Sequence, residues 1–346
     1  MRHLQRFVMA VVLAALLAVT GLVGTASAAS HSRHGSARAT EQDGAYVVSE
    51  RRISDRILDL TVQSPALGRT GIVRLITPRG WDQRRHGQRW PVLYLLHGCC
   101  DTPDSWTRET DVEEIAALRN VLVVTPEGGE VGWYSNWWNH GAGGPPAWET
   151  FHLTEVRRLL ERGYGAGRRR VIAGVSMGGA GAMTYAARHR RMFRAAASYS
   201  GVVHPLADPY GVLGAFGDFG AEDPYAIWGD PLAQVDIWTD HDPVYLAPSL
   251  RGKQLFLSVG NGEAGPFDPP DYFDGGEAWL QGQNIALFAR LRQLRIPVTT
   301  DFYGPGTHSW PYFERELHRS LPILLGALAR ASSSANVKRR AVARVG

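Results

Sequence analysis

The sequence contains few cysteines and no common metal-binding pattern. Only two cysteines occur among 346 residues, and they are neighbours, Cys99-Cys100. A disulfide between adjacent cysteines closes a small strained ring, so we expect two small buried thiols instead. C-x-x-C and His-Glu-x-x-His are absent, and the histidines are scattered along the chain. These absences exclude the usual zinc and dithiol motifs, and we expect neither a metal nor a cofactor.

Only one long hydrophobic run occurs, and it lies at the N-terminus. Residues 7–23 are apolar, follow Arg2 and Arg6, and precede Ala26-Ser27-Ala28, which has the small-x-small form of a signal peptidase site. The run is short for a spanning helix, so residues 1–28 are predicted to be a signal peptide rather than an anchor. We therefore expect a protein that is secreted or associated with the cell envelope, with no transmembrane segment after cleavage.

The body of the chain has no excess of positive charge. The formal net charge changes from +4 to −2 once six terminal residues are set aside: Arg2, Arg6, Lys338, Arg339, Arg340 and Arg344. This balance argues against a nucleic-acid partner. Residues 29–45 are predicted to be a flexible leader and residues 331–346 a disordered basic tail, for which association with an anionic envelope stays open. No internal repeat is visible, and residues 46–330 are expected to form one domain.

Within that domain, strand patterns alternate with helix patterns. Residues 56–62 and 71–77 alternate in polarity around a turn and predict a hairpin at the sheet edge. Further strands are predicted at 90–96, 121–124, 170–173, 195–200, 255–259 and 298–303, and helices at 111–120, 149–162, after residue 180, 277–294 and 313–325. Alternation of buried strands with helices is typical of a doubly wound α/β domain with a mostly parallel sheet.

One segment carries a clear chemical signal. Gly174-Val175-Ser176-Met177-Gly178 has the G-x-S-x-G form and lies between a predicted strand and a predicted helix. This context is typical of a nucleophile elbow, in which the serine occupies a tight turn and presents its oxygen to a cleft. Ser176 is therefore the predicted nucleophile, although such glycine-rich turns also occur as purely structural features.

An activated serine needs a base, and in α/β-hydrolases the chain order is serine, acid, histidine. His308 lies in a Gly/Pro loop after the last predicted strand and is the predicted base. The other histidine late in the sequence, His318, lies on a predicted helix and is interpreted as a surface histidine.

The acid loop after residues 255–259 offers five carboxylates, and spacing alone does not choose among them: Glu263, Asp268, Asp271, Asp274 and Glu277. Most of these are expected to be solvated loop charges.

The oxyanion formed during acyl transfer needs two backbone N–H donors. The residue after the nucleophile, Met177, is predicted to supply one. The loop His97-Gly98-Cys99-Cys100, which follows a central strand, is predicted to supply the other through Cys99. His97 is interpreted as a group that shapes this loop or lines the substrate site, not as a second base.

Over residues 56–325 the chain resembles the antigen 85 mycolyltransferases and related esterases of actinobacteria. Six segments carry the resemblance: 64–69 (SPALGR), 133–137 (WYSNW), 148–151 (WETF), 227–229 (IWG), 260–262 (GNG) and 306–310 (GTHSW). The resemblance implies an α/β-hydrolase fold and a serine that forms an acyl-enzyme, which passes its acyl group to a sugar, a glycerolipid or water. It also implies that the triad is Ser176, Glu277 and His308, because the family's acid lies seven residues before an asparagine, as Glu277 precedes Asn284.

Two departures bear on the substrate. The family's acyltransferases have Asp-Gly-Leu-Arg where this chain has residues 97–100, and their loop cysteines are replaced here by residues 141–146. Trp310 matches a tryptophan that lines the family's substrate site, although a core role would account for it equally well.

We therefore expect a secreted serine acyl-ester hydrolase or acyltransferase acting on an acyl ester or lipid. The alternatives are a mycolyltransferase or diacylglycerol acyltransferase proper, a plain carboxylesterase, and a non-catalytic envelope-binding protein of the same fold.

Overall fold

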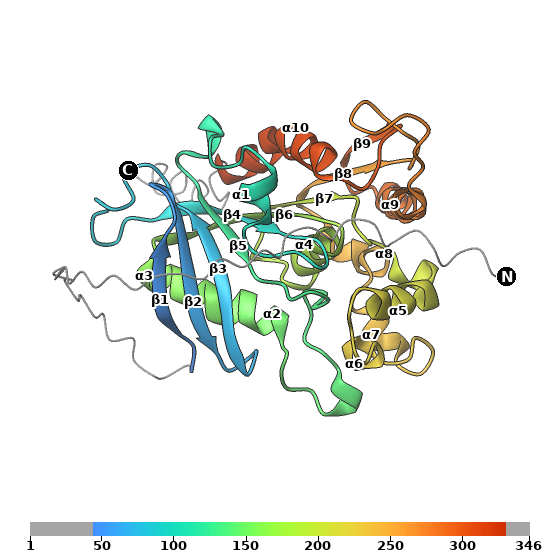
Figure 1. Cartoon of the computed structure of the whole chain (residues 1–346), viewed down its shortest axis with the longest axis horizontal. Coiled ribbons are helices and arrows are strands. Elements are labelled where there is room, and N and C mark those ends of the chain that lie inside the picture. Colours follow the sequence, from blue (N-terminus) through green and yellow to red (C-terminus); the bar gives the residue numbers. More distant parts are fainter. Residues whose placement is uncertain (1–43, 330–346) are drawn as a thin grey trace, which may run out of the picture. The chain divides into compact units, whose positions relative to one another are not determined.

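The computed structural model describes residues 44–329, and within this range a single mixed sheet organises the chain (Figure 1). Its spatial order is β1-β2-β3-β5-β4-β6-β7-β8-β9. The first three strands are antiparallel, and β5 and the strands beyond it run parallel to one another. The strands are β1 (Tyr46–Arg52), β2 (Ile57–Ser64), β3 (Arg69–Ile76), β4 (Trp90–Leu96), β5 (Leu122–Pro126), β6 (Ala166–Val175), β7 (Ala195–Tyr199), β8 (Gln254–Gly260) and β9 (Thr299–Gly304).

Helices fill the connections between the parallel strands. The α-helices are α1 (Ser105–Glu109), α2 (Trp148–Thr150), α3 (Arg157–Gly163), α4 (Met177–Arg188), α5 (Pro209–Asp218), α6 (Tyr225–Trp228), α7 (Val235–Thr239), α8 (Pro243–Leu246), α9 (Gly275–Gln293) and α10 (Trp310–Ala329). Short 3-10 turns are η2 (Ala116–Leu118), η3 (Asn139–Gly141), η5 (Pro205–Ala207) and η6 (Ala247–Leu250), and η4 (Phe151–Val156) is π-helical. The predicted helix at 149–162 is therefore confirmed, with a π-helical segment between α2 and α3.

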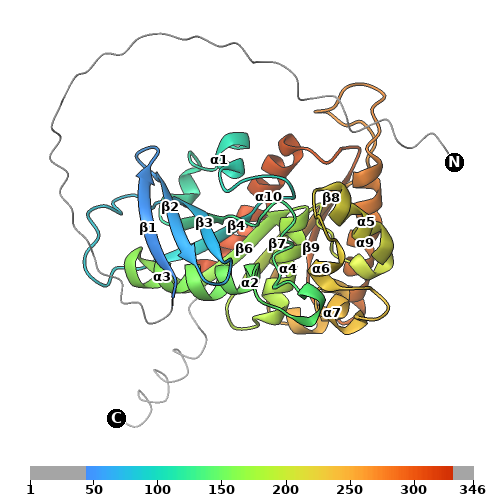
Figure 2. The same cartoon turned by 60° about the horizontal axis from the view of Figure 1, so that its bottom comes forward.

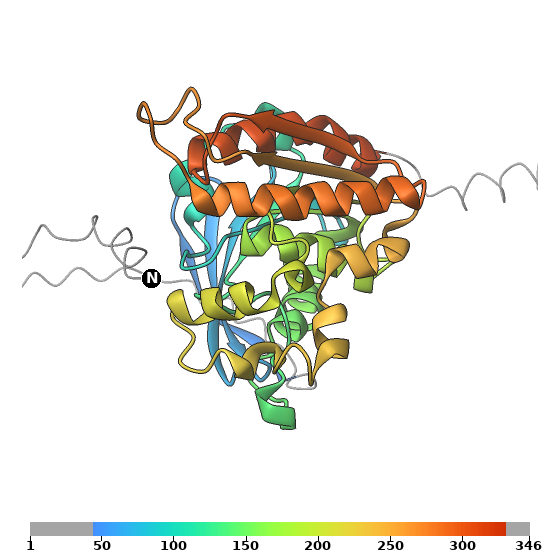
Figure 3. The same cartoon turned by 90° about the vertical axis from the view of Figure 1, so that its right-hand side faces the viewer.

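Both faces of the parallel sheet are buried. In β4, Val92, Tyr94 and Leu96 pack in one core cluster, and Leu93 and Leu95 pack in the other. The first cluster includes residues of α3, α4 and α9, whereas the second includes α1 and α10. Figure 3 shows α10 in red and α9 in orange on opposite sides of the last strands. The continuous apolar sequence of β4 is thus explained by burial on both faces, which confirms the predicted layered arrangement.

Two predictions about elements are wrong. The hairpin of β2 and β3 is not the edge of the sheet, because β1 pairs outside it (Figure 2). The residues of β1 are mostly exposed, and three of the seven are charged, as is usual for an edge strand, so no hydrophobic alternation predicts β1. The helix expected at 111–120 is reduced to turns and η2. Its buried residues Val112, Ile115 and Leu118 lie three apart, which suits 3-10 turns better than an α-helix.

Several predictions lie outside the described residues. The signal peptide at 1–28, nearly all of the leader at 29–45 and the tail at 331–346 fall there. Within residues 44–329, no helix has both the length and the apolar character needed to span a membrane.

Candidate active site

Ser176 occupies a strained turn between β6 and α4. Its backbone has φ 54° and ψ −121°, a conformation that side-chain-bearing residues rarely adopt. The turn is held by the Ser176 N–H, which donates to the carbonyl of Tyr199 at 2.9 Å, and by the Ser176 carbonyl, which accepts from the Ala180 N–H at 3.1 Å. Ser176 is therefore the residue that precedes the first turn of α4, with the positive end of the helix dipole behind it.

The glycines on either side of Ser176 are required by close backbone contacts. A Cβ on Gly174 would lie 2.3 Å from the carbonyl oxygen of Gly178, and one on Gly178 would lie 2.5 Å from the carbonyl oxygens of Leu96 and His97. Neither approach is compatible with a side chain. The G-x-S-x-G pattern is thus explained sterically, because the turn packs directly against the end of β4.

Glu277 and His308 are brought together across 31 residues of sequence. His308 Nδ1 lies 2.7 Å from Glu277 Oε2, and the Glu277 side chain is fully buried while that of His308 is 27% exposed. Glu277 Oε1 accepts from Ser200 Oγ at 2.6 Å, from the Gly260 N–H at 2.7 Å and from Tyr303 Oη at 3.2 Å. Because a carboxylate only accepts hydrogen bonds, Nδ1 is the donor of the fourth contact, and the proton-free position of the neutral ring is Nε2.

Three donors that no sequence pattern predicted surround the buried carboxylate. Ser200 follows β7 with φ 46°, Gly260 ends β8, and Tyr303 lies in β9. The pKa of Tyr303 is raised by burial and by the adjacent Glu277, so its hydroxyl remains a donor. No local motif marks these residues, because they meet only where three strands end side by side.

Asp274 is an exception to the expectation that most of the loop acids are solvated charges. Its carboxylate caps α9 by accepting from the N–H groups of Gly276 and Glu277, and it also accepts from the His308 N–H at 2.8 Å. One side chain therefore fixes both the start of the helix that carries Glu277 and the backbone of His308. The spacing Asp274-x-x-Glu277 is that of a helix capping box, which is a signal that the sequence did contain.

The remaining acids of this loop do not contact His308 in the described structure. Asp268 accepts from Thr307 Oγ1 and Tyr312 Oη, and these hydrogen bonds lower its pKa although partial burial acts in the opposite direction. Glu263 and Asp271 are exposed. A pocket of about 570 Å³ opens in the same loop, lined by residues 263–265, 268 and 270–273.

His97 shapes the loop after β4 and does not line a surface. It is 1% exposed, its Nε2 accepts from the Gly128 N–H at 2.8 Å, and its Nδ1 donates to the Gly98 carbonyl at 2.7 Å. Burial lowers its pKa, which fits this neutral tautomer. The expectation that His97 lines the substrate site is therefore wrong, because both ring nitrogens are already used inside the protein.

The loop after β4 runs beside the nucleophile at Gly98. A Cβ on Gly98 would lie 3.3 Å from Ser176 Cβ, so the two backbones are in close contact. Among the described residues, the Cys100 N–H donates to the Glu130 carbonyl, whereas the Cys99 N–H has no acceptor. Met177 is the first residue of α4, where an N–H has no partner within the helix. The N–H groups of Cys99 and Met177 are thus two donors without an acceptor among the described residues.

The cysteine thiols are free and lie 2.8 Å apart. Cys99 is half-buried and Cys100 is exposed, so the expectation of two buried thiols is wrong for Cys100. The hydrogen bond from Cys99 lowers the pKa of the Cys100 thiol. Cys100 has φ 60°, a left-handed backbone conformation at the end of the loop.

Trp310 is half-buried at the start of α10. Its ring meets Trp106 edge to face with centroids 5.2 Å apart, and it meets Phe313 at 5.7 Å. Phe313 in turn contacts the His308 ring at 5.0 Å. These contacts place Trp310 in the aromatic group behind His308, and its role in lining a substrate site stays a prediction.

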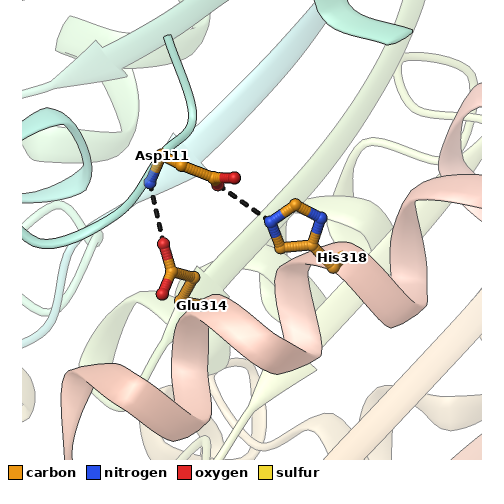
Figure 4. A group of neighbouring side chains, drawn as sticks. All are labelled: Asp111, Glu314 and His318. Atoms are coloured by element: carbon orange, nitrogen blue, oxygen red, sulfur yellow. Dashed lines mark hydrogen bonds and ion pairs between the residues drawn. The ribbon is translucent and has the colours of Figure 1, made fainter. Parts of the chain in front are cut away.

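His318 is an exposed residue, as expected. In the described part of the chain, it belongs to the only group that could offer three ligands to a metal, with Asp111 and Glu314 (Figure 4). His318 Nε2 lies 2.8 Å from Asp111 Oδ1, and the Asp111 N–H donates to Glu314. Asp111 and His318 thus pair through their side chains, Glu314 accepts from the Asp111 backbone, and these contacts join α10 to the loop after α1.

The sheet order, the turn at Ser176 and the position of His308 define an α/β-hydrolase. Solved structures agree with this fold. MPT51 of Mycobacterium tuberculosis matches with a TM-score of 0.67 and 25% identity, covering 80% of this chain and 100% of that one. FphF of Staphylococcus aureus, a fluorophosphonate-binding serine hydrolase, matches with a TM-score of 0.60 and 21% identity, covering 79% and 98%.

Sequence comparison identifies the family. The profile of the family described as "Putative esterase" matches residues 64–324. Esterase Rv1288 of M. tuberculosis is 32% identical over 266 residues, 73% of this chain and 56% of that protein, so the chain spans little more than half of this relative's length. The diacylglycerol acyltransferase/mycolyltransferase Ag85B of Mycolicibacterium smegmatis is 28% identical, covering 77% and 83%. The chain belongs to this esterase family, and the resemblance to antigen 85 proteins is confirmed.

Proposed function

We propose that the chain is an exported serine acyl-ester enzyme in which Ser176 is the nucleophile, His308 the base and Glu277 the acid. Ser176 Oγ attacks the ester carbonyl while His308 Nε2 takes its proton. The tetrahedral oxyanion accepts hydrogen bonds from the N–H groups of Cys99 and Met177. His308 returns the proton to the departing alcohol, which leaves an acyl group on Ser176. Water or a second alcohol then attacks the acyl-enzyme, with His308 again carrying the proton.

The observation that best supports this proposal is the hydrogen bond between Glu277 and His308. With four donors around Glu277, the ring holds its proton at Nδ1 and leaves Nε2 free to accept one. A general base needs this arrangement, because a carboxylate at Nδ1 orients the ring and fixes its tautomer. Among the described residues the Ser176 hydroxyl has no hydrogen bond, so the contact with His308 is one that we expect to form as substrate binds.

Apolar side chains near the site favour an acyl substrate. Large hydrophobic residues are exposed in α5 and in the acid loop, among them Tyr210, Phe267 and Phe273. Cys100, at the end of the oxyanion loop, lies 3.6 Å from the carbonyl of Phe219, which directly follows α5 and is itself exposed. We infer that these residues contact the acyl chain, because burying them against a hydrocarbon removes apolar surface from water.

The proposal is tested with p-nitrophenyl butyrate and a fluorophosphonate probe. The wild-type chain should release p-nitrophenol and be labelled on Ser176. Ser176→Ala should lose labelling and most turnover, by a factor on the order of 10⁴ or more, with an unchanged unfolding temperature. Equal turnover in Ser176→Ala would refute the mechanism. Absence of both turnover and labelling in the folded wild-type chain would favour a non-catalytic envelope-binding protein.

A further inference from the structure

Arginines from three distant segments line one pocket at the far end of the sheet from Ser176. Arg157 belongs to α3, Arg170 to β6, and Arg188, Arg190 and Arg191 to the end of α4 and the loop that follows. With His189 and Met192 they line an open hollow of about 470 Å³. Ser176 precedes α4 and Arg188 ends it, so a helix of 12 residues, roughly 18 Å long, separates the pocket from the nucleophile. The pocket is therefore not part of the candidate active site.

Carboxylates neutralise only part of this charge. Glu161 lies 3.1 Å from Arg157 Nη1 and also pairs with Arg170. Glu149 lies 3.3 Å from Arg188 Nε, and Asp240 lies 3.4 Å from Arg188 Nη1. Five arginines thus face three carboxylates.

Two of the arginines have no partner within the part of the chain that the structure describes. Arg190 and Arg191 are exposed, and neither side chain makes an ion pair or hydrogen bond there. Both follow directly after α4 and line the pocket. Their charges are the ones that the neighbouring carboxylates leave unbalanced.

A buried donor in the same pocket lacks an acceptor. Arg170 is 6% exposed, and its Nε has no hydrogen-bond partner among the described residues, although its Nη2 contacts Glu161. Leaving a buried guanidinium N–H unsatisfied is unfavourable, so such groups usually meet water or a ligand. Lys253 lies nearby, and its pKa is lowered to about 8, first by burial and then by the charge of Arg190.

We propose that this arginine pocket binds a phosphate group, supplied either as a free phosphate or pyrophosphate anion or as the headgroup of an anionic lipid. Planar guanidinium groups match the oxygen geometry of phosphate and bind it through paired hydrogen bonds. A doubly charged anion balances Arg190 and Arg191, and one of its oxygens can accept the Arg170 Nε proton. Binding at this end leaves the opening near Ser176 free, so phosphate does not compete with an ester substrate.

The unfolding temperature of the full chain tests the site. Wild type is compared with Arg190→Gln/Arg191→Gln and with a matched control, Arg85→Gln/Arg89→Gln, which removes the same charge from exposed positions in the loop before β4. Sodium pyrophosphate at about ten times its dissociation constant should raise the unfolding temperature of wild type and control by about 3 °C relative to sodium chloride of equal ionic strength. The unfolding temperature of the pocket variant, Arg190→Gln/Arg191→Gln, should rise by less than about 1 °C. Equal shifts in all three proteins, or none in wild type, would overturn the proposal.

Vesicles distinguish the two sources of phosphate. If the ligand is a lipid headgroup, wild type and control should sediment with phosphatidylcholine vesicles that contain phosphatidic acid, and the pocket variant should sediment several-fold less. All three proteins keep the basic C-terminal residues, so that segment does not account for a difference. If pyrophosphate raises the unfolding temperature but no protein sediments, the ligand is the free anion. Ester turnover should be the same in all three proteins, and a loss confined to the pocket variant would contradict the separation of the two sites.

Discussion

His308 and Glu277 form a hydrogen bond of 2.7 Å in which the imidazole donates from Nδ1 to a carboxylate that is completely buried. The second carboxylate oxygen is occupied by Ser200, Gly260 and Tyr303. This arrangement fixes which nitrogen of His308 carries the proton.

Glu277→Gln should lower ester turnover on the order of 10³ to 10⁴-fold. The Gly260 N–H is a fixed donor, so the new amide must keep its oxygen toward Gly260 and turn its NH₂ group toward His308. The ring then accepts at Nδ1 and carries its proton at Nε2, where it cannot take a proton from Ser176. Steady-state kinetics with p-nitrophenyl butyrate measures the effect. The exposed Glu263→Gln is the matched control, and a silent Glu277→Gln would exclude Glu277 as the acid.

Asp274→Asn should reduce turnover roughly 10 to 100-fold and also destabilise the protein by about 1 kcal/mol. Its carboxylate accepts from the His308 N–H and caps α9 at the same time, and an amide has only one accepting oxygen for these two tasks. Turnover and thermal unfolding are both measured. Asp271→Asn, exposed in the same loop, should change neither quantity. An unaltered rate in Asp274→Asn would show that the contact with His308 is dispensable.

Hydrolysis should exceed acylation of trehalose. Transfer to a sugar requires polar groups that hold one hydroxyl near the acyl-enzyme, since water is present at a far higher concentration. The loop after β4 offers no such pair, because His97 is buried with both nitrogens occupied and Cys100 carries only a thiol. Mass spectrometry of products formed with trehalose, diacylglycerol or buffer alone measures the partition, with Ser176→Ala as the blank. Acylated trehalose as the main product would instead favour a mycolyltransferase.

Glu316→Gln should make stability less dependent on pH. Glu316 is almost fully buried, and burial raises its pKa from 4.5 to about 7 despite contacts with Arg315 and Arg319. The folded state therefore keeps a proton that the unfolded state loses between these values, so wild type becomes less stable as pH rises from about 4.5 to 7. The free energy of unfolding of wild type should fall by about 1–3 kcal/mol over this pH range because of Glu316. Denaturant unfolding at pH 5 and 7.5 measures the free energy of unfolding of wild type, Glu316→Gln and the exposed control Glu114→Gln. The control should show the same pH dependence as wild type.

The nucleophile and base could be predicted from the sequence because their signals are local. The turn at Ser176 needs glycines because an added Cβ on Gly174 or Gly178 would lie within 2.5 Å of a backbone oxygen, and this steric requirement appears in five consecutive residues. His308 follows from chain order once that turn is recognised. The buried strands were also predictable, because two-sided burial in a parallel sheet leaves continuous apolar runs.

The partners of those residues were decided by tertiary structure. Five acids in one loop are equivalent by spacing, and Glu277 meets His308 because α9 starts where β7, β8 and β9 end together. The buried ring of His97 accepts a hydrogen bond from the Gly128 N–H, 31 residues away in the sequence. The arginine pocket likewise joins segments that no local pattern relates. Short-range sterics and hydrophobic periodicity are encoded in neighbouring residues, whereas hydrogen bonds and charge clusters between distant segments exist only once the chain has folded.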